Sequence, residues 1–189
     1  MSQWFVVIVV LFMFAGVGCG NGGSGGSAAP NAPGAPGAPG DYSAMLPAQI
    51  LDGIEKQHPA AYYILAAKLF EEGKKDDAVF WFYTGQLRYR YHLMANKDLN
   101  PSGDPALFAS LSEQVGRSLN EYAFGDIPKL AATIDRVLKW DDEHDNAFTA
   151  KSKNAAEYKK IRSGLGDMKD HITANEASIK RDRKAAGLD

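Results

Sequence analysis

The chain has 189 residues, of which 45% are hydrophobic and 23% are charged, and its formal net charge is −2 at pH 7. It contains one cysteine, which excludes an intramolecular disulfide framework. The positive charge is not gathered into a basic tract of the kind that nucleic-acid-binding proteins carry, so we expect no nucleic-acid partner.

An uninterrupted apolar run opens the chain. It extends from Trp4 to Val17, fourteen residues without a charged side chain. A membrane-spanning helix needs about 20 apolar residues. The apolar region of a secretory signal takes about 7 to 15 and is followed by small residues. The run therefore predicts a signal segment over residues 1–18, which would export the rest of the chain.

The only cysteine, Cys19, follows this run directly. The order of apolar run, small residue, cysteine and Gly/Ser-rich stretch resembles the lipobox of bacterial lipoproteins, with Val17, Gly18 and Cys19 at the matching positions. In that family the cysteine is diacylated on sulfur and becomes the new N-terminus after cleavage. The resemblance implies Cys19 as a lipid-attachment site and a membrane as partner. Because Gly16 stands where leucine is usual, plain secretion and an uncleaved anchor stay open as alternatives.

Residues 19–40 predict a linker. They contain no charged residue, and Ala-Pro-Gly units repeat through their second half. Such a composition cannot bury a core, and its glycines and prolines favour a flexible, extended chain. We therefore expect a disordered linker here. Gly20, instead of aspartate, follows the cysteine, which by resemblance to enteric lipoproteins implies the outer membrane facing the periplasm. Secretion or the cell surface is the alternative.

Residues 41–189 amount to one domain and carry all the formal charge, with net −6 over 41–150 and net +4 over 151–189. Their apolar residues recur at helical spacing, and no alternating strand pattern occurs. We predict an all-α domain of five to seven helices. The expected helices cover residues 47–57, 60–72, 75–94 and 104–115, then 127 to a polar loop at 141–146, and 154–185 with a break at 164–166 left open.

Two helix starts share a signal. Asp104 precedes a proline, and Asp126 precedes Ile127-Pro128. Aspartate is a favoured N-cap, and proline is well placed in a first helical turn. Both aspartates are therefore predicted to cap helices.

The segment 60–91 has a repeat-like pattern around a turn at Gly73. It resembles a single tetratricopeptide or Sel1-like helix-turn-helix, although no second copy follows. Small residues stand where two helices would cross closely, and large apolar residues fill the gaps between them. The resemblance implies a tight helical hairpin of a kind that offers concave surfaces to peptides. Its positions are Leu65, Ala66, Leu69, Ala78, Phe82 and Gly85.

The second helix of this pair is apolar nearly all round, which allows two interpretations. A helix of this kind is usually a central core helix. Alternatively, its aromatic residues line a groove that stacks a peptide or glycan, with tyrosine hydroxyls and arginines as a polar rim. The residues of this possible binding face are Trp81, Arg88, Tyr89, Arg90 and His92.

The residue patterns contain no catalytic or cofactor motif, so we expect no metal, no other cofactor and no enzymatic activity. Segments 98–104 and 141–146 alternate oxygen donors like the start of an EF-hand loop. The twelfth residues are Ala109 and Ser152, whereas the loop needs a glutamate there. We interpret the first segment as a turn with a helix cap and the second as a solvated loop.

The expected function is a protein-binding module of the bacterial cell envelope, such as a scaffold, an assembly factor or an inhibitor of the immunity type. The alternative is an envelope enzyme or a small-ligand or peptide binder that uses the face around Trp81, Tyr89 and His92. An enzyme should gather at least two of four polar residues in a deep pocket, namely Arg88, His92, Glu113 and Asp126.

Overall fold

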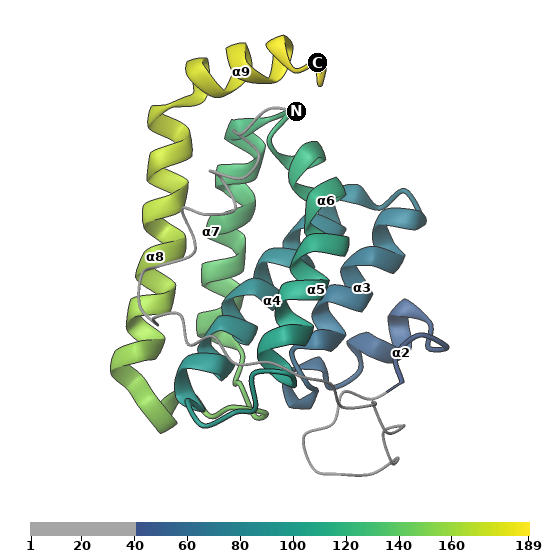
Figure 1. Ribbon diagram of the computed structural model, residues 1–189, viewed down its shortest axis with the longest axis vertical. Coiled ribbons are helices and arrows are strands. Elements are labelled where there is room, and N and C mark those ends of the chain that lie inside the picture. Colours follow the sequence, from purple (N-terminus) through teal and green to yellow (C-terminus); the bar gives the residue numbers. More distant parts are fainter. Residues whose placement is uncertain (1–40) are drawn as a thin grey trace, which may run out of the picture. The chain divides into compact units, whose positions relative to one another are not determined.

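The computed structural model describes residues 41–189, in which it has eight α-helices and two short 3-10 helices (Figure 1). No strand occurs between these residues, which confirms the all-α class. The predicted signal segment 1–18, Cys19 and the predicted linker 19–40 lie outside the described residues. The elements are α2 (Pro47–Leu51), η1 (Ile54–Lys56), α3 (Ala60–Glu71), α4 (Lys75–Ala95), α5 (Asp104–Gln114), α6 (Gly116–Ala123), α7 (Ile127–Glu143), η2 (Lys151–Asn154), α8 (Ala155–Ala174) and α9 (Glu176–Ala185).

Helix α4 lies at the centre of the domain. It packs against α3, α5, α6, α7 and α8, and more than half of its residues are buried (Figure 1). A helix with neighbours on every side must be apolar nearly all round, because each of its faces leaves water. The structure therefore places α4 in the core, as the first interpretation of its sequence pattern predicted.

Helices α3 and α4 form a tight hairpin. The turn is made at Gly73, whose φ of 79° suits glycine. The two helices then approach so closely that a Cβ built on Gly85 would lie 2.8 Å from the Cβ of Tyr62. The small residue expected at this crossing is thus required by the distance between the two backbones.

Three features of the helices differ from the expectation. The first predicted helix is interrupted at Gly53, where φ is 63° and the chain continues as η1. Helix α6 was not predicted; it starts at Gly116, which lets the ring of Phe82 approach its backbone. The C-terminal helical region breaks at Asn175, not at the glycines of 164–166. The side chain of Asn175 donates to the His171 carbonyl at 2.8 Å, and such local bonds compete with helix continuation.

The helices between residues 41 and 189 include none with both the length and the apolar character needed to cross a bilayer.

Candidate functional site

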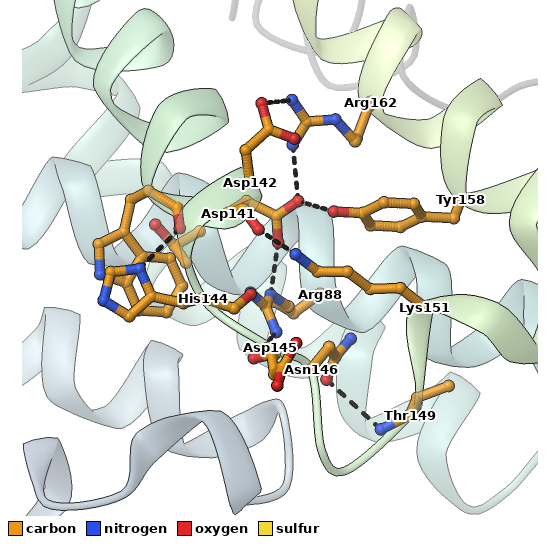
Figure 2. Close-up of polar contacts among 12 residues, drawn as sticks. Arg88, Asp141, Asp142, His144, Asp145, Asn146, Thr149, Lys151, Tyr158 and Arg162 are labelled. Carbon is orange, nitrogen blue, oxygen red and sulfur yellow. Dashed lines mark hydrogen bonds and ion pairs between the residues drawn. The ribbon is translucent and has the colours of Figure 1, made fainter.

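A buried ion pair joins Arg88 of α4 to Asp141 of α7 (Figure 2). The side chains of Arg88 and Asp141 are 1% and 0% exposed, and Arg88 Nε lies 2.7 Å from Asp141 Oδ1 without a well-aligned hydrogen bond. The two terminal nitrogens of Arg88 donate to the carbonyl oxygens of Asp145 (2.7 Å) and His144 (3.0 Å). A charge that is removed from water is stable only with such partners, and the guanidinium of Arg88 uses all three of its nitrogens on groups of the protein interior.

Helix α8 and the segment before it complete this group. Arg162 donates to Asp141 Oδ2 at 2.7 Å, and the Tyr158 hydroxyl donates to the same oxygen. Lys151 donates to the Asp141 backbone carbonyl. Burial, followed by the hydrogen bond to Asp141, raises the pKa of Tyr158, so its hydroxyl keeps the proton that it donates. We call these five residues the Asp141 cluster; they tie α4, α7 and α8 together.

The interpretation of 141–146 as a solvated loop was therefore wrong at its first and last residues, because Asp141 and Asn146 are both buried. Asp141 belongs to the last turn of α7 and is fully buried. The reason is Arg88, which α4 carries into the core and which requires a carboxylate there. No local signal distinguishes Asp141 from its exposed neighbour Asp142, because the partner comes from a distant part of the chain.

A second polar group lies where α3 and α5 begin and α4 ends. Asp104 Oδ1 is 3.0 Å from His58 Nε2, and Asp104 Oδ2 is 2.9 Å from His92 Nε2. The side chains of the two histidines are 1% and 9% exposed. The Tyr89 hydroxyl lies 3.4 Å from Asp104 Oδ1, and Thr149 Oγ1 lies 2.8 Å from His92 Nδ1. We call these five residues the Asp104 cluster.

Asp104 is consequently not the helix cap that its sequence context predicted. It is the first residue of α5, and Gly103 occupies the cap position before it. The carboxylate of Asp104 accepts hydrogen bonds from the two histidines instead of capping the helix. The same prediction is confirmed for Asp126, which precedes α7 and accepts the Lys129 backbone N–H at 3.0 Å.

The proton positions in the Asp104 cluster follow from the donors that face Nδ1 of each histidine. The N–H of Ala60 donates to His58 Nδ1 at 3.1 Å, so Nδ1 carries a lone pair. A neutral imidazole then has its proton on Nε2, which donates to Asp104. In the same way, His92 Nδ1 has the Asn96 amide as a donor at 3.1 Å, and its Nε2 faces the other carboxylate oxygen.

The ligand atoms of His58, His92 and Asp104 lie within 4.8 Å of one another, so we tested whether the set fits a metal ion. Two imidazoles and a carboxylate suit zinc or non-haem iron. A metal on His58 Nε2 would require a proton on Nδ1, which would then face the Ala60 N–H. The geometry therefore fits a carboxylate that accepts two imidazole N–H groups, and it does not fit a metal centre.

The possible binding face of α4 lies inside the domain. Arg88, Tyr89 and His92 are buried, and Trp81 and Arg90 are half-buried. Trp81 packs edge-on against Trp140, with ring centroids 5.3 Å apart, and the guanidinium of Arg90 lies over the Phe108 ring. This face is not an open aromatic groove, because α3, α5 and α7 cover it.

The four residues that an enzyme was expected to gather have separate roles. His92 and Arg88 belong to the two different clusters described above. Glu113 forms an exposed ion pair with Arg117 on the surface of α5 and α6, and Asp126 caps α7. The structure therefore does not gather these four side chains in one pocket; each makes its contacts at a different place in the domain.

A surface hollow of about 670 Å³ lies at the other end of α4. The rings of Phe70 and Tyr122 stand edge to face, 6.2 Å between centroids, and the ammonium of Lys75 lies 5.3 Å from both. Asp76 accepts a hydrogen bond from the Tyr122 hydroxyl at 2.8 Å and pairs with Lys129 at 2.7 Å. The hydrogen bond to Asp76 raises the pKa of Tyr122. The hollow thus offers aromatic and cationic groups at the surface.

Comparison with known proteins adds one relative. A protein of Haemophilus influenzae, described as an uncharacterized protein, is 34% identical over 86 residues. The match takes in 46% of this chain and 33% of that protein, so the chain spans about a third of the relative's length. No family model and no solved structure matches the chain.

Proposed function

We propose that this protein is a bacterial envelope lipoprotein, attached to the membrane through Cys19, whose helical domain binds another protein. The anchoring rests on one observation, the apolar run of residues 4–17 that ends at Gly18-Cys19 and is followed by a charge-free linker. Two acyl chains give stable membrane attachment, and about twenty linker residues allow the domain to reach a partner roughly 25 Å away.

The hollow around Phe70, Lys75 and Tyr122 is the surface that we assign to the partner. Aromatic side chains are enriched at protein interfaces and often supply most of the binding energy. The repeat-like hairpin of α3 and α4 supports the same role by resemblance, since Phe70 and Lys75, on either side of its turn, line the hollow. The two clusters are not assigned to this partner, because in the closed domain their charges already pair with one another.

Replacing Cys19 with serine is expected to move the protein from the membrane fraction to the soluble fraction and to abolish incorporation of a labelled fatty acid. The measurement is fractionation of the native host, with the unaltered protein as control. Retention of the Cys19→Ser variant in membranes, without label in either form, would contradict the lipid anchor and favour an uncleaved span.

Replacing Tyr122 with alanine is expected to reduce recovery of the native partner by at least tenfold, since a hot-spot residue contributes about 2 kcal/mol or more. Crosslinking in the host, followed by mass spectrometry, identifies the partner and measures the loss. Lys139→Ala is the matched control, because Lys139 is an exposed residue of α7 that does not line the hollow. Equal recovery for both variants would place the partner elsewhere.

A further inference from the structure

Helix α5 is held less firmly than the helices around it. None of its eleven residues is buried, whereas every longer helix of the domain contributes to the core. Phe108 packs against the interior, with its ring centroid 5.1 Å from that of Tyr89 and 6.3 Å from that of Tyr63. Segments with few buried contacts open at low free energy. Among the helices that pack against α4, α5 is therefore the one that should detach at the lowest free energy.

The polar contacts of α5 are unequal along its length. Towards its end, Ser112 has only long contacts, at 3.3 Å to the Tyr63 hydroxyl and 3.4 Å to Gln86. At its first residue, Asp104 makes short contacts to both His58 and His92. The Asp104 cluster is thus the principal polar attachment of α5 to α3 and α4.

Helix α6, which follows directly, is firmly anchored. Gly116 and Leu119 are buried, and the Tyr83 hydroxyl donates to the Asn120 side chain at 2.9 Å. A Cβ at position 116 would lie 2.9 Å from the Phe82 ring, so α6 sits directly against α4. Motion of α5 would accordingly pivot at Val115, the residue between the two helices.

We propose that α5 is a flap that the Asp104 cluster latches at neutral pH and that acid releases when His58 takes up a second proton. The groups that face His58 are Asp104 from α5, His92 and Tyr89 from α4, and the ring of Phe148 from the loop before η2. The only nitrogen free to accept a proton is Nδ1, which receives the Ala60 N–H. Protonation breaks that hydrogen bond and places a cation in a site that is 1% exposed.

The direction of the effect follows from linkage. Burial lowers the pKa of His58 from its ordinary 6.5 in the closed domain, and the attraction of Asp104 offsets only part of this shift. In the open state the ring meets water and recovers the ordinary value. As pH falls below about 6.5, the open state therefore binds protons that the closed state does not. The ratio of open to closed molecules then rises by up to about tenfold per pH unit until the closed-state pKa is reached.

Release of α5 would uncover the aromatic side chains beneath it, Tyr63 and Tyr89. Tyr89 belongs to the face that the sequence marks as a possible binding surface. The flap would thus control access to an interior aromatic face, independently of any partner that uses the hollow at the far end of α4.

The test measures the position of α5 in the full chain carrying Cys19→Ser, which removes the single cysteine of the sequence. Spin labels on Ala109→Cys in α5 and Ala132→Cys in α7 report the distance between these two helices. Both positions are exposed, so the labels can be attached without disturbing the core. We expect the distribution to lengthen between pH 8 and pH 5. A second pair, Ser118→Cys with Ala132→Cys, reports α6 against α7 and should stay constant.

His58→Gln should abolish the lengthening, because an amide can donate to Asp104 and accept from Ala60 but does not titrate in this range. His171→Gln, at an exposed histidine of α8, should leave it intact. An unchanged α5 distance at pH 5, or a simultaneous change in the α6 pair, would overturn the proposal. So would stoichiometric Zn²⁺ that raises the melting temperature and fails to do so in His58→Gln, since the cluster would then be a metal site.

Discussion

Replacing Asp141 with asparagine is expected to lower the free energy of unfolding by about 3–5 kcal/mol. The carboxylate is fully buried and accepts contacts from Arg88, Tyr158 and Arg162. The amide has nearly the same shape but no charge, so Arg88 loses its counter-ion in a site that excludes water, and Arg162 keeps only the exposed Asp142 as partner. Urea denaturation followed by circular dichroism measures the change.

Asp142→Asn is the matched control. Asp142 pairs with the same Arg162 at 2.7 Å, but its side chain is 64% exposed. Exposed pairs contribute about 0–1 kcal/mol, so this variant should stay close to the parent. A double variant, Arg88→Met with Asp141→Leu, should recover much of the loss, since apolar replacements of a buried pair leave no unpaired charge. If Asp141→Asn and Asp142→Asn were equally mild, the buried pair would not stabilise the domain.

Replacing Gly85 with alanine is expected to lower the free energy of unfolding by about 2 kcal/mol. The added Cβ would lie 2.8 Å from Tyr62 Cβ and 3.2 Å from the ring of Tyr63. Both Cβ atoms sit directly on helix backbones, so α3 and α4 must move apart to relieve the overlap. The better helix propensity of alanine, about 1 kcal/mol, offsets only part of this cost. The same denaturation experiment measures the result.

Gly166→Ala should have the opposite sign. Gly166 lies within α8 and has open space around the position of a Cβ, so the substitution is expected to raise stability by about 0.5–1 kcal/mol. A pair of variants with the same chemistry and opposite effects would show that the close crossing of α3 and α4 decides the result. Stabilisation by both substitutions would mean that the hairpin is looser than its 2.8 Å approach requires.

Much of the helical architecture could be predicted because its signals are local. The turn at Gly73, the proline-led starts of α5 and α7, and the apolar character of α4 are each written in a few neighbouring residues. Helix α6 was missed because its local signal is unfavourable for a helix. Its first residue is a glycine, which discourages a helix locally, and only the Phe82 ring packed against it explains the choice.

The sequence by itself determined the order of the chain: an apolar run shortly before Cys19, a charge-free stretch rich in glycine, alanine and proline, and a helical domain in which one helix is apolar nearly all round. Only the tertiary structure decided how the polar residues are used. Asp104 turned from an expected cap into the partner of two histidines, and Asp141 from a solvated loop residue into the centre of a buried cluster. The physical reason is that helix periodicity and capping depend on residues within a turn or two. The partner of a buried charge is set by which distant helices the fold brings together, because an interior charge is stable only where its counter-charge already lies.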